Sequence, residues 1–442
     1  MSTVKQLGCV LATMFVVALV APGAFAADLG GNCCADLEER IAELEASTAK
    51  VTNKGKVRVE VTGVVNEALI AWGDGILGKA NSAVIPNGVN PSRFAFVASS
   101  NLGHGYSAGA TFSIYVGQWD ALTGSGMLGG IQANGQSTLA VREASAYIST
   151  SWGKVTLGKT AQATYKIADQ STANVQDADE LLSFAPLFGG PGATEVLDFY
   201  SGQYLDVVRF ETQKYNGVVL SASWGRDGEV ANFATGCGTS VGAPACQKNE
   251  WDVAARWEGG YQQFKGKAGV GYREGGVFTG LQPLLAFPML AYADKTYSGG
   301  LSVMHAPTGW FADGAYGHTD LTGTLGGPGV GKPTIVTWEV RTGVEEHWVQ
   351  GLGKTTVYVE YADMKLDNIL NGLTGPKDTS TDVKWWGVGV VQALNEAVNV
   401  YANVKDYMLG SDLKDNNVCT GVCNGPQAKD TTVGMVGAAI KF

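Results

Sequence analysis

The sequence predicts an all-β transmembrane protein, an antiparallel β-barrel of about 16 strands that follows a short N-terminal periplasmic coiled-coil helix. Three observations lead to this prediction. Glycine occupies 61 of 442 positions and charged residues make up only 16%, as expected for many short strands and turns. Apolar residues alternate with polar ones along many segments. Long polar connections alternate with short ones, the pattern of barrels with long outer loops and short periplasmic turns.

The first 26 residues are predicted to be a secretory signal peptide. Lys5 provides the positive region, Leu7–Val20 the apolar region, and Ala24–Ala26 an A-x-A cleavage site. The alternative, a membrane helix, needs about 20 apolar residues, and this run is shorter. Removing Lys5 changes 31 basic and 41 acidic residues to 30 and 41, a net charge of −11. Such an acidic chain is a poor partner for nucleic acid.

Ala35–Val51 is the segment with clear helical periodicity, within a predicted periplasmic stub at residues 27–55. Its apolar residues follow the a/d pattern of a coiled coil. Arg40-Ile41-x-x-Leu44-Glu45 resembles a short motif that specifies three-stranded coils, so we predict a trimer helix carried by Leu37, Arg40, Ile41, Leu44 and Glu45. A helix that packs on its own domain is the alternative.

Six cysteines remain after cleavage, as the close pairs Cys33/Cys34, Cys237/Cys246 and Cys419/Cys423. An even number in near pairs favours disulfides in an oxidising compartment. Adjacent cysteines bond to each other only with strain. Cys33 and Cys34 could therefore link neighbouring chains, remain as two thiols, or form a strained vicinal bridge. A metal site at Cys419-x-x-x-Cys423 is disfavoured, because no further Cys or His lies nearby in the sequence.

Residues 56–442 are predicted to form the barrel, since no later stretch is apolar enough for a membrane helix. One apolar face, for example, is formed by Tyr106, Ala108, Ala110, Phe112, Ile114 and Val116. A soluble sandwich would show the same alternation, so the connections decide. Short ones lie near 101–105, 151–153, 213–217, 259–263, 306–309, 350–354 and 393–397. Long ones lie near 74–91, 118–140, 160–204, 226–250, 275–295, 319–333, 364–382 and 408–431.

The last ten residues alternate up to Phe442, which resembles the C-terminal signature strand of outer-membrane proteins. We therefore expect Phe442 to be the assembly signal read by the barrel-insertion machinery. We expect the wall to contact outer-membrane lipid and lipopolysaccharide. Aromatic residues near strand ends are predicted to form interfacial girdles: Trp72, Tyr106, Trp152, Trp251, Trp257, Tyr272, Trp338, Trp348, Trp386 and Tyr407.

The connection from Thr160 to Tyr204 is long and acidic, and a loop of this length needs a function. We expect it to fold into the barrel and narrow the pore with Asp169, Asp177, Asp179, Glu180, Glu195 and Asp198. Basic residues that share parity with polar neighbours should face the lumen: Arg58, Arg93, Arg209, Arg256, Arg273 and Arg341. Arg142 is ambiguous. If several lie opposite the loop, a transverse field would order water and dipolar solutes. Alternatively, each is a solvated lumen residue at another depth.

Several short motifs occur in an order that resembles the alphaproteobacterial general porins over almost the whole mature chain. They are Cys33-Cys34, the helix from Ala35 to Arg40, Ser92–Phe96, Val141–Ala144 and Trp152–Lys159. The resemblance implies a homotrimer of sixteen-strand barrels whose third outer loop folds inward. It implies passive diffusion of small hydrophilic solutes, with Thr160–Tyr204 as that loop.

Other functions have weaker support. Gly326–Lys332 imitates a phosphate-binding loop but is followed by Pro333, and the four histidines are scattered. We therefore expect no catalytic residues, no metal and no cofactor. A solute-selective outer-membrane channel, for sugars or anions, is the alternative, and a barrel enzyme is less favoured.

Overall fold

The computed structural model describes residues 57–73, 80–117, 138–184, 197–198, 200–226, 249–275, 277–278, 291–323, 334–367, 380–410 and 430–442. The predicted signal peptide, the predicted helix Ala35–Val51 and the loop residue Glu195 lie outside these ranges. In the described part no helix is long and apolar enough to cross a membrane.

The cysteines predicted to form disulfides also lie outside the described residues. They are Cys33, Cys34, Cys237, Cys246, Cys419 and Cys423. The described ranges resume at Asn249, three residues after Cys246. The three predicted pairs, Cys33/Cys34, Cys237/Cys246 and Cys419/Cys423, therefore stay predictions from the sequence.

Within these ranges the chain forms twenty strands. They are β1 (Val57–Gly73), β2 (Ala80–Pro86), β3 (Arg93–Gly103), β4 (Tyr106–Gly117), β5 (Thr138–Ser149), β6 (Gly153–Ala161), β7 (Ser183–Phe184), β8 (Leu197–Asp198), β9 (Tyr204–Thr212), β10 (Val218–Arg226), β11 (Asn249–Tyr261), β12 (Phe264–Glu274), β13 (Val277–Phe278), β14 (Ala291–His305), β15 (Trp310–Gly323), β16 (Thr334–Glu346), β17 (Thr355–Asp367), β18 (Ser380–Ala393), β19 (Val398–Leu409) and β20 (Thr431–Lys441).

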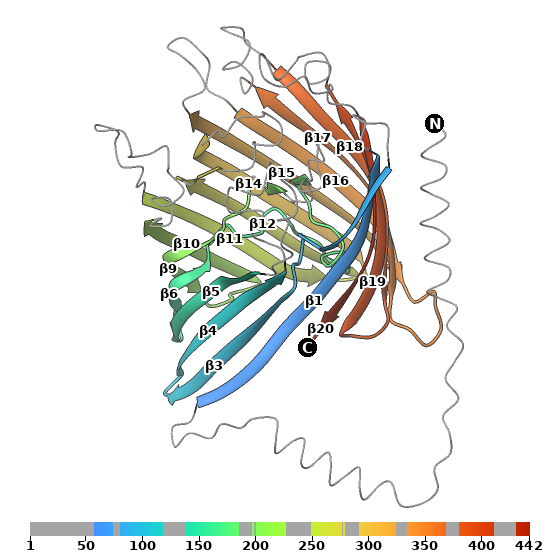
Figure 1. The fold of residues 1–442 in the computed structure, drawn as a ribbon. Coiled ribbons are helices and arrows are strands. Elements are labelled where there is room, and N and C mark those ends of the chain that lie inside the picture. Colours follow the sequence, from blue (N-terminus) through green and yellow to red (C-terminus); the bar gives the residue numbers. More distant parts are fainter. Residues whose placement is uncertain are drawn as a thin grey trace, which may run out of the picture.

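Eighteen of these strands form one antiparallel sheet that closes into a barrel (Figure 1). β2 and β3 lie end to end along β1, and β12 and β13 lie end to end along β14. The wall therefore has 18 − 2 = 16 strand positions. Pairing of β1 with both β3 and β20 closes the wall into a ring. The predicted fold class is confirmed.

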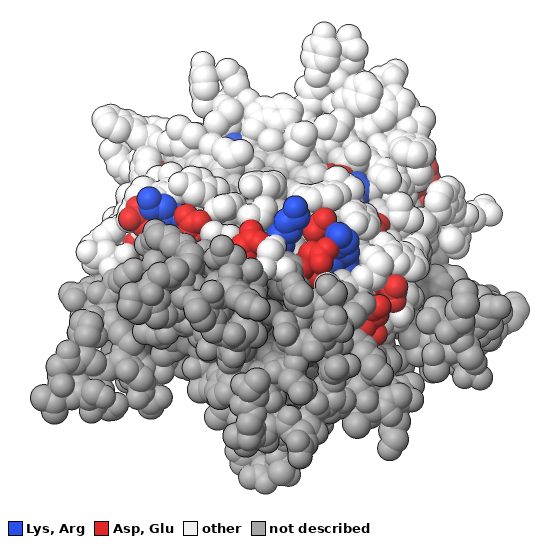
Figure 2. All heavy atoms as spheres, turned by 90° about the horizontal axis from the view of Figure 1, so that it is seen from above, with Lys and Arg blue, Asp and Glu red and all other residues white. Residues whose placement is uncertain are grey.

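Alternation sets which side chains face outward. On β1, Val57, Val59, Val61 and Val65 are exposed on the outside, while Asn66, of the opposite parity, is buried inside. The predicted apolar face of β4 also lies outside, with Phe112 and Val116 exposed. Apolar residues that remain exposed on a closed wall are typical of contact with lipid. In Figure 2 most of the visible charged side chains gather in a band beside the grey residues, and most of the remaining described surface is white.

All seven predicted short connections are turns at one end of the barrel, where β1 begins and β20 ends. The turn between β3 and β4 shows why such links are tight, since Gly103, His104 and Gly105 all have positive φ. At this end the backbones of Gly63 and Phe442 exchange two hydrogen bonds. A Cβ on Gly63 would lie only 2.5 Å from the Phe442 ring, so this glycine makes room for the ring.

The prediction that residues 74–91 form one long connection was wrong. Ala80–Pro86 is a strand that pairs with the outer half of β1. Main-chain pairing decides this, because the side-chain pattern of the segment is weak. The chain then leaves the wall at Asn87 and returns at Arg93, and Ser92 Oγ accepts the hydrogen bond of the Asn66 amide (2.9 Å) in the resulting gap.

Most of the predicted girdle aromatics lie on the outer surface, among them Trp152, Trp338 and Trp386. Trp72 and Tyr407 are exceptions, with exposed fractions of 3% and 5%. They share the parity of the lumen-facing residues on β1 and β19. Strand parity therefore overrides the position of an aromatic residue near a strand end.

Candidate channel constriction

The loop between β6 and β9 folds into the barrel and is described over residues 162–182 and 200–203, with the short β7–β8 pair between them (Figure 1). It begins under strong restraint from β11. Asp252 accepts hydrogen bonds from the amide (2.6 Å) and hydroxyl (2.7 Å) of Thr164. Arg256 donates to the carbonyls of Ala163 (2.8 Å) and Tyr165 (2.7 Å). These contacts turn the chain inward directly after β6.

The middle of the loop follows the wall past β12 and β14. Lys267 Nζ donates to the carbonyl of Ser171 (2.8 Å), and Ser302 Oγ accepts from the amide of Thr172 (2.8 Å). Two glycines allow the close approach. A Cβ on Gly300 would lie 2.0 Å from the carbonyl oxygen of Ala168, and one on Gly269 would lie 2.5 Å from that of Ile167. The wall is therefore shaped to the loop backbone.

Asp177 fixes the loop to the seam where the barrel closes. Its carboxylate accepts from Asn399 on β19 (2.5 Å) and from Asn90 (2.8 Å), and it pairs with Lys441 on β20 (2.7 Å). Its carbonyl accepts from Asn66 on β1 (3.0 Å). Four separate chain segments thus hold one residue, so the loop spans the interior from β11 to β1.

Asp179 enters a buried charge network on β16, β17 and β19. Its carboxylate lies 2.7 Å from Lys405 Nζ and 3.6 Å from Arg341, and Tyr358 donates to it (3.0 Å). Glu360 lies 2.7 Å from Lys405 and 3.1 Å from Arg341. Breaking a buried ion pair costs about 3–5 kcal/mol, because the remaining charge is left without a partner.

Burial favours the neutral form of Asp179, but Lys405 and Arg341 outweigh it and hold its pKa below the usual value. A carboxyl whose pKa is lowered by folding stabilises the folded state above its ordinary pKa of about 4. That contribution is lost only as the pH falls through the lowered pKa.

Lys166 connects the two halves of the loop. Burial opposes its charge, but Glu180 and Asp169 raise its pKa above the usual value. Its Nζ lies 2.7 Å from Glu180 and donates to the carbonyl of Val89 (2.9 Å). Lys166 has a positive φ of 51°, which few residues other than glycine adopt. The loop is therefore also tied to the inward segment between β2 and β3.

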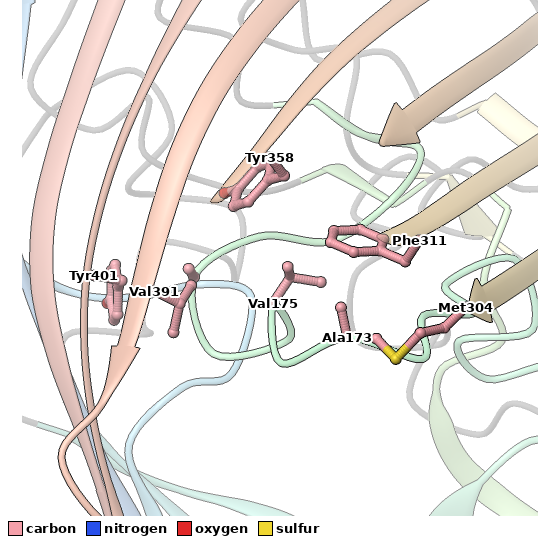
Figure 3. Packing of buried hydrophobic residues seen from close by; sticks show 8 residues of the cluster. Ala173, Val175, Met304, Phe311, Tyr358, Val391 and Tyr401 are labelled. Carbon is pink, nitrogen blue, oxygen red and sulfur yellow. The ribbon is translucent and has the colours of Figure 1, made fainter. Parts of the chain in front are cut away.

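An apolar cluster fills the space between the loop and the wall (Figure 3). Val175 contributes from the loop and is fully buried. Two further loop residues and five wall residues, from β14, β15, β17, β18 and β19, surround it: Ala173, Ala178, Met304, Phe311, Tyr358, Val391 and Tyr401. Burying a valine side chain contributes about 1.5–3 kcal/mol. The loop is held by packing as well as by ion pairs.

The predicted loop acids do not share one environment. Asp169, Asp177, Asp179 and Glu180 are buried, with exposed fractions of 7% or less. Asp169 accepts from the amide of Leu181 (3.2 Å). Asp198 belongs to β8, which pairs with β7. Asp169, Asp177, Asp179 and Glu180 thus hold the loop to itself and to the wall.

The predicted wall arginines also divide. Arg256 and Arg273 donate to loop carbonyls, and Arg341 contacts Asp179 directly. Arg209 donates to the carbonyl of Ala161, the last residue of β6 before the loop. Arg58 does not reach the loop in the described structure; it pairs with Glu60 near the start of β1. At Asp179 and Arg341 the loop and wall charges lie 3.6 Å apart and interact directly, because a buried site strengthens such a contact.

Arg142 is directed into the lumen by a β-bulge. The register between β4 and β5 shifts between Ser113 and Ile114, so that Val141 and Ala144 both lie on the outer face with two residues between them. Arg142 Nε donates to Tyr115 (3.0 Å), and its guanidinium lies 4.0 Å from the centre of the Tyr204 ring. A strict alternation of strand residues does not predict this orientation.

Arg93 lies next to Arg142 on the same side of the lumen. It donates to Asn90 Oδ1 (2.6 Å) and to the carbonyl of Pro91 (3.0 Å), which are neutral acceptors. Neither arginine has a carboxylate within ion-pair distance among the residues that the structure describes. Both side chains are only partly buried. They form a positive site at the lumen wall of β3 and β5.

Residues missed in the sequence include the loop anchors Asp252, Glu360, Lys405 and Lys441. The sequence signal that could have identified these residues is strand parity, that is, which side of the wall a strand residue faces. On β19, Lys405 shares the inner face with Asn399, Tyr401 and Asn403, opposite Val398, Val400, Ala402 and Val404. Parity places such a residue in the lumen, but it does not say which loop residue it meets.

The family profile described as Gram-negative porin matches residues 12–410. The chain belongs to the Gram-negative porin family. No curated protein sequence matches the chain. Among solved structures, this porin is similar to an anion-selective porin from Comamonas acidovorans, with a TM-score of 0.57, 15% identity, and coverage of 87% of this chain and 100% of the other.

Two further structures share the fold. OmpT of Vibrio cholerae gives a TM-score of 0.51 at 12% identity, covering 89% of this chain and 100% of the other. OmpF of Salmonella typhi gives 0.51 at 11%, covering 88% and 99%. The family and the closed barrel identify a channel of the outer membrane, through which small hydrophilic solutes diffuse passively. They indicate a channel rather than an enzyme.

Replacing Gly300 by alanine should loosen the loop, because the added Cβ would lie 2.0 Å from the Ala168 carbonyl oxygen. Overpacking of this kind typically costs about 1–3 kcal/mol. We expect the barrel to unfold at a lower temperature on heated denaturing gels. Gly314→Ala on β15 is the matched control, since nothing lies within 4 Å of its Cβ position. Equal unfolding temperatures for the two variants would contradict the described loop position.

Proposed function

We propose that this porin is a homotrimer in which each barrel conducts solutes separately and the loop at 162–203 narrows the passage. The observation that carries this proposal is the attachment of the loop to the wall from β11 to β1. A loop held by Asp252, Asp177 and Asp179 at three places restricts the interior permanently. One similar structure, OmpT of Vibrio cholerae, is described as a trimer form.

The regions outside the described residues have roles in the same proposal. Residues 1–26 direct export and are cleaved, and residues 27–55 form a periplasmic trimer stub. Cys237 bonds to Cys246 and Cys419 to Cys423, while the connectivity of Cys33 and Cys34 stays open. The outer wall contacts lipid and lipopolysaccharide. Membership of the alphaproteobacterial branch remains a prediction from the sequence motifs.

Planar-bilayer recordings test the channel function. Purified, detergent-solubilised protein should give stepwise increases in current at all voltages near zero. Conductance should rise in proportion to salt concentration, as expected for a water-filled passage without a saturable site. Absence of steps from protein that is folded by circular dichroism would refute the proposal.

A second candidate is an anion-preferring channel, which Arg93 and Arg142 favour. Both are partly exposed and bond only to neutral groups in the described structure. A passage beside two such cations attracts anions and repels cations. The anion-selective porin from Comamonas acidovorans has a similar fold, but its selectivity belongs to that protein. Reversal potentials in a salt gradient distinguish the two candidates.

Phe442 is proposed as the assembly signal, supported by the contact of its ring with Gly63. Phe442→Ala should strongly reduce the amount of folded protein in the outer membrane, because the closing strand loses its terminal aromatic residue. Phe442→Tyr keeps the ring and is the control. Membrane fractionation and the heat-dependent gel shift measure both variants. Normal levels of folded Phe442→Ala would reject this role.

A further inference from the structure

Glu67 is an exception on the outer wall of β1. Its strand neighbours of the same parity, Val65 and Leu69, are apolar, and the residue itself is exposed. Its carboxylate accepts a hydrogen bond from Ser92 (2.8 Å), and no described cation lies within ion-pair distance. A charge on the lipid face of a barrel is destabilising, most of all near the membrane centre. Glu67 is therefore unsuited to a surface covered by lipid.

The aromatic residues divide the outer wall into two halves. β10 to β18 carry exposed aromatic residues toward the end with the long loops, namely Trp224, Trp251, Tyr297, Tyr316, Trp338 and Trp386. The described outward residues at the same end of β19, β20, β1, β3, β4, β5, β6 and β9 include no tryptophan or tyrosine that is exposed. Aromatic girdles mark the lipid interface. At the end with the long loops, the described residues of the half from β19 to β9 therefore lack the girdle that marks a lipid interface.

Strand registers place one basic residue of this half at the level of Glu67. Val61 pairs with Phe96, Phe96 with Phe112, Phe112 with Ala144, and Ala144 with Lys159 on β6. Each of these four steps from strand to strand is about 4.8 Å long and runs perpendicular to the strands. Because the strands are tilted about 45° from the barrel axis, the four steps together rise about 14 Å along that axis. Glu67 lies six residues beyond Val61. Each residue advances about 3.3 Å along the strand, so six residues at the same tilt also rise about 14 Å along the barrel axis.

The two rises have the same direction. From Glu67 in the opposite direction around the wall, the successive backbone pairs run through β20, β19 and β18 to Thr355. Thr355 is the first residue of β17 and lies at the end with the short turns. Steps from β1 toward β6 therefore climb toward the outer end, as β1 itself does. Glu67 and Lys159 lie at one level, separated by about a quarter of the circumference.

In a ring of three copies, a cylinder touches its two neighbours along lines about 60° apart, and the same two flanks meet at every contact. Glu67 and Lys159 are about 90° apart around the wall, so each lies about 15° beyond one of these contact lines. The midpoint between Glu67 and Lys159 falls on β4, next to the centre of the half that lacks an exposed aromatic girdle at the end with the long loops. Two independent features thus select the same face.

We propose that the face from β19 to β9 contacts other copies of this chain, and that Glu67 of one subunit forms an ion pair with Lys159 of the next. This rests on the proposed homotrimer and adds its orientation and one contact. An ammonium group has three donors, so Lys159 can bind this carboxylate in addition to a contact within its own chain. The pair gives Glu67 a counter-charge away from water.

Cross-linking with a short bismaleimide tests the contact in the full-length protein. The double variant Glu67→Cys, Lys159→Cys should give covalent dimers and trimers on boiled gels, above the level of the wild type. The pair Val340→Cys, Lys159→Cys is the matched control, since Val340 is exposed on the opposite side of the wall. Equal products from both pairs, or none from the first, would overturn the inference.

A failure of the proposed contact can be distinguished from a failure of the proposed homotrimer. Unheated samples show first whether the protein migrates as a trimer, and a monomer there would refute the proposed assembly itself. Glu67→Gln provides a second measurement without new cysteines. Its trimer should dissociate at a lower temperature than the wild type, whereas Glu60→Gln, on the inner parity beside Arg58, should not. An intact trimer with an unchanged dissociation temperature would overturn the contact.

Discussion

Replacing Lys405 by methionine should release the constriction loop from the wall and increase single-channel conductance. Lys405 Nζ lies 2.7 Å from both Asp179 and Glu360. Methionine keeps most of the side-chain volume but removes the charge, so Arg341 alone faces these two carboxylates. Loss of one partner from a buried ion pair costs about 3–5 kcal/mol. The unfolding temperature on heated gels and the conductance in planar bilayers measure the two effects.

A second substitution identifies the cause. Adding Asp179→Asn to Lys405→Met removes one of the carboxylates that repel each other, so the double variant should be more heat-stable than Lys405→Met alone. Such a departure from additivity is expected for residues in direct contact. The control is Lys214→Met, whose exposed pair with Glu258 is worth about 0–1 kcal/mol. If Lys405→Met behaves as Lys214→Met does, the charge network does not hold the loop.

Neutralising Arg93 and Arg142 together should shift the reversal potential toward cation preference. Both guanidinium groups face the lumen and have no carboxylate partner among the described residues. Removing two charges near a passage changes the energy of a permeating anion by about 1 kcal/mol, equivalent to about a fivefold change in permeability ratio. Arg93→Gln, Arg142→Gln should be measured in a potassium chloride gradient.

Arg58→Gln is the control for this experiment, because Arg58 is exposed and paired with Glu60 at the start of β1. It should change the reversal potential much less. The heat stability of the double variant should be checked first, since Arg142 also packs on the Tyr204 ring. A stable double variant with an unchanged reversal potential would exclude these arginines from the solute path.

The arrangement of the wall could be predicted because it depends on local periodicity. Val57, Val59 and Val61 face outward for the same reason that Arg58 and Glu60 do not, namely the two-residue repeat of a strand. The alternation of short and long connections then indicated a closed barrel. Ala80–Pro86 was missed as a strand, because its place depends on pairing with β1 rather than on its own pattern.

The loop residues could be identified as polar and acidic, but their partners could not. Asp177 meets Asn399 and Lys441, more than 200 positions away in the chain, and Asp179 meets Lys405. Such pairs arise only when the barrel closes. Arg142 is a similar case, since one extra residue in β5 reverses the side of the wall to which it points.

The sequence by itself determined a closed barrel with an apolar outside, a polar lumen and an inward loop, because side-chain alternation and connection length are local properties of the chain. Only the tertiary structure decided that Asp169, Asp177, Asp179 and Glu180 of this loop are buried while Arg93 and Arg142 remain partly exposed to the lumen. The physical reason is that burial makes an unpaired carboxylate costly, and only closure of the barrel determines which distant cation lies close enough to pair with it.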